Sequence, residues 1–175
     1  TSNIEMAAAS QFELYANASL DSDRKNELKL LQTKYSATPY AAIASLQQAK
    51  TFIAKQKWSD AILQLEWAAK KSSMPAFKQI ARLQLAAIAY QQKKYQHGLD
   101  ILNVLADDSY LALVNQRRAE LYVALGKTAK AHAALKAAMA WYKENGLPAP
   151  LLQRQLASLQ QADKTAPRSI KTGEK

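Results

Sequence analysis

A pattern of six small, aromatic and aliphatic positions occurs three times along this 175-residue chain. Within each copy, successive positions are separated by 3, 6, 3, 4 and 3 residues, and the copies are offset by 37 and then by 33 residues. Steps of three and four return a side chain to the same face of an α-helix, so each copy predicts two helices joined by a short turn. The copies are Ala49, Phe52, Trp58, Ala61, Leu65, Ala68; Ala86, Ala89, Tyr95, Gly98, Leu102, Leu105; and Ala119, Tyr122, Thr128, Ala131, Leu135, Ala138.

Small residues in this pattern let two helices cross closely, and the larger residues fill the space beside each crossing. We expect three such crossings: Ala49 with Ala61, Ala86 with Gly98, and Ala119 with Ala131. A single hairpin cannot bury both of its apolar faces, so neighbouring hairpins must stack. A repeat near 34 residues with this layout is the signature of tetratricopeptide proteins. The first helix pair fits the pattern poorly, as expected of an end repeat.

The composition also indicates an all-helical chain. Only four glycines and five prolines occur, too few turn-forming residues for a many-stranded β-sandwich. The predicted fold class is all-α: tetratricopeptide-like antiparallel helical hairpins stacked in a right-handed superhelix, about nine helices with a C-terminal capping helix. The helices are expected near residues 4–19, 21–34, 39–55, 59–71, 75–92, 95–106 and 109–125, then an eighth ending near Asn145 and a ninth from Pro148 or Pro150 to about residue 162.

Several residues mark the expected ends of these helices. Pro39 and Pro75 suit the first turn of a helix, where the missing N–H has no partner to lose. Gly126 offers a left-handed C-terminal cap. Apolar periodicity stops after Ala162. We therefore predict one tetratricopeptide-like helical repeat domain over residues 1–162 and a disordered basic tail over residues 163–175.

The positive charge is concentrated in the middle of the chain. The net charge is +10, and residues 50–94 hold nine basic and two acidic residues. Such a segment could attract nucleic acid, anionic lipid or an acidic partner, or could form only a solvated polar face. Nucleic-acid binding is disfavoured because the aromatic residues that would stack on bases are committed to packing by the repeat.

The chain carries no recognisable catalytic or metal-binding motif. It has no cysteine, no HExxH motif and no glycine-rich phosphate loop. His97 and His132 fall in different repeats, where we expect exposed or partly packed turn residues. Asp107 and Asp108 indicate a helix N-cap rather than an acid–base pair. The sequence therefore predicts no enzyme, no cofactor and no metal.

A stack of helical hairpins presents a concave groove lined by the first helix of each pair. The mixed aliphatic and polar surface predicted there suits an extended or amphipathic peptide. The first or ninth helix could instead cover part of it. Tetratricopeptide modules that clamp an acidic C-terminus use Lys and Asn at groove positions that here hold Leu46, Lys50, Leu83 and Ala87, which disfavours that mode. The predicted partner-binding groove comprises Leu46, Lys50, Ile53, Leu83, Ala87, Tyr90, Gln116, Glu120 and Val123.

Three long runs also resemble a known family. They are TPYAAIASLQQAKTFIAKQKWSDAILQLEWAAKKS, IARLQLAAIAYQQKKYQHGLDILNVL and LVNQRRAELYVALGKTAKAHAALKAAM. Together with the opening helix and a closing helix that starts at proline, they resemble the YfgM-like family over roughly residues 4–160. Members of that family are ancillary subunits of the bacterial SecYEG translocon.

The resemblance implies an inner-membrane protein with a short cytoplasmic N-terminus, one transmembrane helix and a periplasmic tetratricopeptide domain. The chain would be the periplasmic part, with the anchor lying just before Thr1. The implied partners are the SecYEG translocon and periplasmic chaperones, to which newly exported chains would be handed. The family offers no binding residues that can be carried over, so the groove residues rest on helix geometry alone.

Other interpretations remain open from the sequence. The chain shows neither a stretch of about 18 apolar residues nor a signal peptide. The alternative function is a soluble cytoplasmic tetratricopeptide scaffold that assembles a regulatory or secretion complex. About 20 apolar residues encoded upstream of Thr1 would favour the membrane-anchored hypothesis. An apolar first helix that packs on another molecule would make a homodimer possible.

Overall fold

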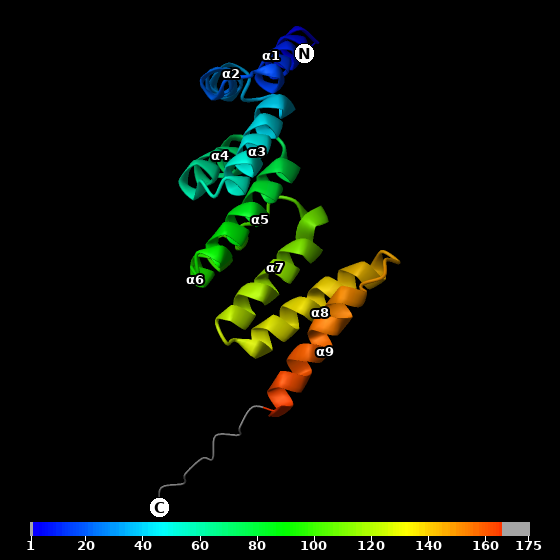
Figure 1. The fold of residues 1–175 in the computed structure, drawn as a ribbon. Coiled ribbons are helices and arrows are strands. Elements are labelled where there is room, and N and C mark those ends of the chain that lie inside the picture. The colour runs from blue at the N-terminus through cyan, green and yellow to red at the C-terminus, as the bar shows by residue number, and fades with distance from the viewer. Residues whose placement is uncertain (1, 166–175) are drawn as a thin grey trace, which may run out of the picture. The chain divides into compact units, whose positions relative to one another are not determined.

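The computed structural model describes residues 2–165, with side chains over residues 3–161. In this part of the chain all regular structure is helical, which confirms the predicted all-α class (Figure 1). The elements are α1 (Ser2–Asn17), α2 (Asp21–Lys34), α3 (Pro39–Ala54), α4 (Trp58–Lys71), α5 (Pro75–Gln91), α6 (Tyr95–Leu102), the 3-10 turn η1 (Asp108–Tyr110), α7 (Leu111–Ala124), α8 (Thr128–Glu144) and α9 (Pro150–Thr165).

The largest error in the predicted helix boundaries concerns the sixth helix. It ends at Leu102 rather than near residue 106, and α7 begins at Leu111 after the short turn η1. The side chain of Gln79 holds the loop that follows this early end, since its Oε1 accepts a hydrogen bond from the N–H of Ala106 at 2.8 Å. Asp107 caps the following turn through the N–H of Ser109 at 2.9 Å, as its predicted capping role requires.

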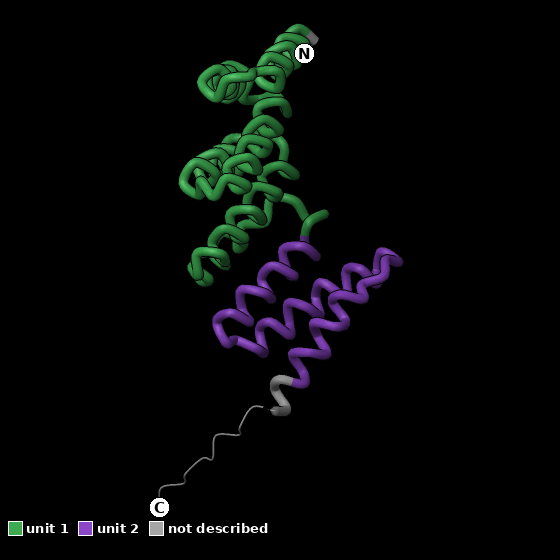
Figure 2. The backbone as a smooth tube through the Cα atoms, viewed as in Figure 1, with its two compact units in different colours: residues 1–110 green, residues 111–175 purple. Residues whose placement is uncertain are grey.

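The chain divides into two compact units (Figure 2). The N-terminal unit comprises residues 1–110 and the C-terminal unit residues 111–175. The right-handed superhelix and the single repeat domain over residues 1–162 stay predictions. The predicted tail over residues 163–175 begins within α9, which runs to Thr165, and its remaining residues lie outside the described part.

In the N-terminal unit, each helix packs on the next in the chain from α1 to α6. All six positions of the first repeat copy contribute to one core cluster, with Ala49, Ala61, Leu65 and Ala68 buried and Phe52 and Trp58 packed against them. At the second predicted crossing, Ala86 and Gly98 are also buried. Small residues at the predicted crossings therefore lie in the interior.

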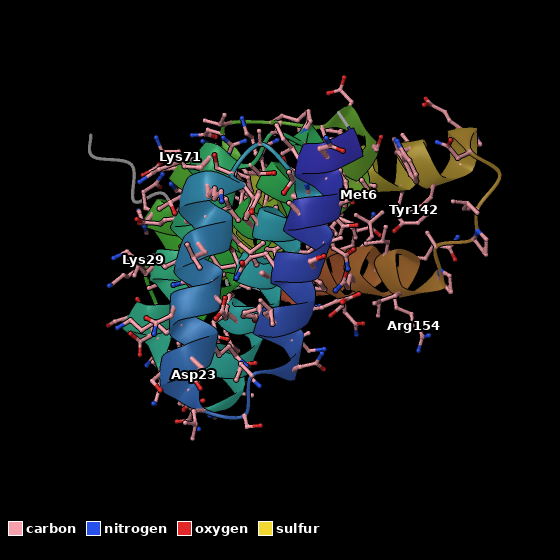
Figure 3. The ribbon with its side chains drawn as sticks, turned by 90° about the horizontal axis from the view of Figure 1, so that it is seen from above. Met6, Asp23, Lys29, Lys71, Tyr142 and Arg154 are labelled. Carbon is pink, nitrogen blue, oxygen red and sulfur yellow. The ribbon has the colours of Figure 1, made fainter. Side chains whose placement is uncertain are left out.

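The atypical first helix pair attaches to the repeats through aromatic side chains. The Tyr15 hydroxyl donates to the carbonyl oxygen of Ala44 at 3.2 Å, and the Phe12 ring lies 5.6 Å from the Tyr40 ring. Burial raises the pKa of Tyr15, against a smaller opposing effect of Arg24, so the phenol stays protonated and able to donate. α1 and α2 lie side by side (Figure 3).

The C-terminal unit contains the third hairpin and the closing helix. Ala119 and Ala131, the third predicted crossing pair, are 2% and 0% exposed. Leu152 of α9 is buried in the same core cluster as Ala119 and Leu135, and Leu156 and Leu159 pack against it. α9 therefore covers the apolar face of α8, as the predicted capping helix should.

The three repeat hairpins share one turn geometry. At the end of the first helix of each hairpin, Gln56, Lys93 and Gly126 adopt left-handed backbone with φ of 55°, 59° and 68°. In the third hairpin the N–H of Lys127 donates to the Tyr122 carbonyl at 2.8 Å, and equivalent bonds close the other two. These are Schellman caps, so the cap predicted at Gly126 is confirmed.

This turn geometry makes Gly126 and Gln56 opposite test cases. Gly126→Ala is expected to lower the free energy of unfolding by about 1 kcal/mol, since a Cβ strains left-handed backbone although no atom lies within 4 Å of it. Gln56→Gly is expected to raise it by about 0.5–1 kcal/mol by removing the same strain. Urea unfolding measures both. Gln56→Ala is the control and should be near neutral; a stabilisation equal to that of Gln56→Gly would contradict the backbone explanation.

Candidate functional site

Three of the predicted groove residues lie on α3. Lys50 is exposed, whereas Leu46 and Ile53 are partly buried and pack against the core cluster of the first hairpin. Lys50 is thus the member of this trio that is most available to a partner. Leu46 and Ile53 expose only part of their aliphatic side chains to a partner.

Three further predicted residues lie on α5, which contacts α3. Leu83 and Ala87 are half-buried, and Tyr90 is 37% exposed. The Tyr90 ring is also paired with the Tyr95 ring at a centroid distance of 5.4 Å and an interplanar angle of 57°. The structure therefore places six predicted groove residues on two neighbouring helices of the N-terminal unit (Figure 1).

The last three predicted residues lie on α7, in the C-terminal unit. Val123 is 49% exposed and Gln116 is half-buried. Glu120 is engaged within its own helix, where its carboxylate forms an ion pair with Arg117. The structure thus separates the predicted set into six residues of one unit and three of the other, and a continuous groove through all nine stays a prediction.

The described residues show no grouping typical of a metal centre. Among them, no three His, Cys, Asp or Glu side chains lie close enough to hold a metal ion. His97 is exposed on α6 and His132 is half-buried on α8, in different units. Nor is any helix of the described part both long and apolar enough to cross a bilayer.

A groove that sequence reasoning missed lies between α4 and α6, with α5 as its floor. It encloses about 300 Å³. Its lining is largely apolar, with charged groups along it: Ile62, Glu66, Ala69, Lys70, Arg82, Leu85, Ile88, Ala89, Gln92, Lys94, His97, Asp100, Ile101 and Val104. The lining includes Val104, which lies beyond the early end of α6 and is 55% exposed. Repeat spacing carries no signal of that early end.

A second hollow, of about 490 Å³, lies between α8 and α9 in the C-terminal unit. Met139, Tyr142, Leu147 and Leu156 form part of its apolar wall. Lys136 and Lys143 line it as well. It is therefore a basic-edged apolar surface that the predicted groove residues do not touch.

Comparison with known proteins accounts for nearly the whole chain. The model of the tetratricopeptide repeat-like domain family matches residues 1–161. An ancillary SecYEG translocon subunit of Neisseria gonorrhoeae is 28% identical over 159 residues, covering 90% of this chain and 76% of that protein. A protein of the same name from Buchnera aphidicola is 27% identical over 108 residues, covering 62% of this chain and 53% of that protein.

No solved structure matches the chain significantly. The family match, the two relatives and the stacked hairpins nevertheless agree with one another and with the resemblance seen in the sequence. The chain is thus a member of the YfgM-like family of tetratricopeptide repeat-like proteins.

Proposed function

We propose that this chain is a non-enzymatic protein–protein interaction module that associates with the SecYEG translocon. The observation that carries the proposal is the similarity to a translocon subunit over 90% of the chain. The fold agrees with it, because stacked helical hairpins present extended surfaces suited to polypeptides. The described residues supply partly exposed apolar side chains on adjacent helices and no metal-binding cluster.

The finer form of the proposal concerns place and partners. We propose that the module lies on the periplasmic side of the bacterial inner membrane, held by an N-terminal transmembrane anchor, and links the translocon to periplasmic chaperones and exported clients. The proposal is supported by the family membership and by the two relatives, which are named as ancillary SecYEG translocon subunits. Direct partners would bind the α3–α5 surface, where Lys50 and Tyr90 are exposed.

Site-specific photocrosslinking in the full-length, membrane-embedded protein tests both the partner and the surface. A photoreactive residue at Lys50 or Tyr90 is expected to form adducts with translocon subunits or periplasmic chaperones. The same residue at Lys29, exposed on α2 and pointing away from the helices (Figure 3), is the control and should form few. Strong translocon adducts from Lys29 alone would refute the α3–α5 surface, and no such adducts from any position would refute translocon association.

The basic segment suggests a second contact. We propose that residues 50–94 also lie against anionic lipid headgroups, because most of their basic side chains are exposed. The exposed ones are Lys50, Lys55, Lys57, Lys70, Lys71, Lys93 and Lys94. Flotation with vesicles of phosphatidylglycerol and phosphatidylcholine should show binding that increases with the anionic lipid. Equal flotation with phosphatidylcholine alone would contradict this contact.

Self-association through α1 is the remaining partner hypothesis. Ile4, Met6 and Leu14 on this helix are 62%, 59% and 58% exposed. A homodimer that buries these side chains would show sedimentation that depends on protein concentration. Concentration-independent sedimentation of a monomer would exclude it.

A further inference from the structure

The groove between α4 and α6 faces away from the predicted peptide surface. Arg82, Leu85 and Ala89 of α5 line this groove, whereas Leu83, Ala87 and Tyr90 belong to the predicted surface. On a helix with 3.6 residues per turn, these two stripes lie about 130° apart. The groove is therefore a separate surface of the N-terminal unit.

Arg82 is the one cation among the α5 residues that line this groove, and it forms no ion pair within the described part of the chain. Its Nη1 is shielded from solvent and has no hydrogen-bond acceptor within the described part of the chain. A buried donor without a partner costs free energy, and the cost is larger for a charged group. Native proteins rarely retain such a group without a reason.

The acidic side chains that line the groove already have other partners. The Glu66 carboxylate pairs with Lys70 at 3.5 Å. Asp100 Oδ1 accepts a hydrogen bond from Gln96 Nε2 at 3.0 Å. The Arg82 guanidinium carries further N–H donors beside the shielded Nη1. Because the residue is only partly buried and lines the groove, these donors are left for an acceptor from outside.

The rest of the lining defines what would bring that acceptor. Leu85 and Ile88 on the floor, and Ile62 and Ile101 on the walls, give the groove apolar lining besides the guanidinium. Lys94 adds a positive charge to the lining, beside the Lys70–Glu66 pair. A ligand that fits both features is apolar along its length and carries a carboxylate within it.

We propose that this groove binds an acidic amphipathic polypeptide segment, with Arg82 pairing with an Asp or Glu carboxylate of that segment. Burial of the segment's apolar side chains supplies attraction without direction. The guanidinium–carboxylate pair supplies orientation and selectivity. The groove would act as a second peptide site on the face of α5 opposite the predicted one, and the proposal does not depend on translocon association.

The test uses the whole chain and a defined pair of peptides. One is a short fluorescein-labelled amphipathic peptide of leucine, alanine and glutamine with a single central glutamate, and the other has glutamine in place of that glutamate. Fluorescence anisotropy should show about tenfold tighter binding of the acidic peptide, as expected of one charge-assisted hydrogen bond. Arg82→Met should abolish the difference between the two peptides. Lys29→Met removes an exposed positive charge on α2 and should preserve the difference.

Two further measurements separate a binding role for Arg82 from a structural one. Arg82→Met should melt at the same temperature as the unchanged protein or higher, since it replaces an unpaired, partly buried charge by an apolar group of similar length. The acidic peptide should shift the methyl NMR signals of Ile101 and Val104, and shift those of Leu83 and Ala87 much less. A clear drop in melting temperature would assign Arg82 to folding and overturn the proposal.

Results that point to a different occupant of the groove would also overturn the proposal. Equal affinity for the two peptides would leave no role for the carboxylate. Displacement of the peptide by acetate at the same concentration would indicate a site for small anions. If Arg82→Met instead converted a dimer into a monomer in sedimentation, the occupant would be a second copy of this chain.

Discussion

Leu65→Ala is expected to lower the free energy of unfolding of the N-terminal unit by about 2–5 kcal/mol. Leu65 is a position of the first repeat copy, is 0% exposed and is among the largest fully buried side chains of the chain. Its truncation removes buried apolar surface and leaves a cavity among tightly packed helices, where the backbone can relax only partly. Urea unfolding, followed by circular dichroism, measures the loss.

A residue two positions away provides the matched control. Leu63 lies on the same helix and is 64% exposed, so Leu63→Ala should change the free energy of unfolding by no more than about 0.5 kcal/mol. The comparison separates burial from helix propensity, because both variants place alanine in α4. Similar losses for the two variants would contradict the placement of the repeat pattern in the core.

Ala131→Leu is expected to destabilise the C-terminal unit by about 1–3 kcal/mol. Ala131 is 0% exposed on α8, and Ala119, its predicted crossing partner on α7, is 2% exposed. The larger side chain has no space to occupy, so it must push α7 and α8 apart or adopt a strained rotamer. The expected result is a lower melting temperature and a lower urea midpoint.

The control for this substitution lies one half-turn along the same helix. Ala133 is exposed on α8, so Ala133→Leu adds the same atoms where solvent leaves room for them. Its effect should stay within about 0.5 kcal/mol. If Ala131→Leu were as harmless as Ala133→Leu, small side chains would not be required at the crossing of α7 and α8.

The sequence predicted the local elements well because their signals are local. The six-position pattern indicated hairpins α3–α4, α5–α6 and α7–α8, whose small residues are buried. Pro39 and Pro75 begin α3 and α5, and Gly126 adopts the left-handed cap. Gln56 and Lys93 adopt the same left-handed backbone without being glycine. The residue type therefore predicted the left-handed cap at Gly126 but not those at Gln56 and Lys93.

The candidate surfaces were predicted less completely. Helix geometry placed Leu83, Ala87 and Tyr90 together on one face of α5, and their part in a partner-binding groove stays a prediction. Helix geometry did not reveal the groove around Arg82, because residues of three helices, α4, α5 and α6, line that groove. Whether Arg82 is buried and whether it has a hydrogen-bond partner depend on how α4, α5 and α6 pack together. The sequence of one helix alone does not determine this.

The sequence by itself determined the helical class, the order and approximate ends of the helices, and the residues that allow close crossings. These follow from steps of three and four residues and from proline and glycine backbone preferences, which act within one or two turns. Only the tertiary structure decided the end of α6, the groove above Arg82 and the division into two units. The physical reason is that such features depend on contacts between distant residues, such as the bond from Ala106 to Gln79 across 27 positions of the chain.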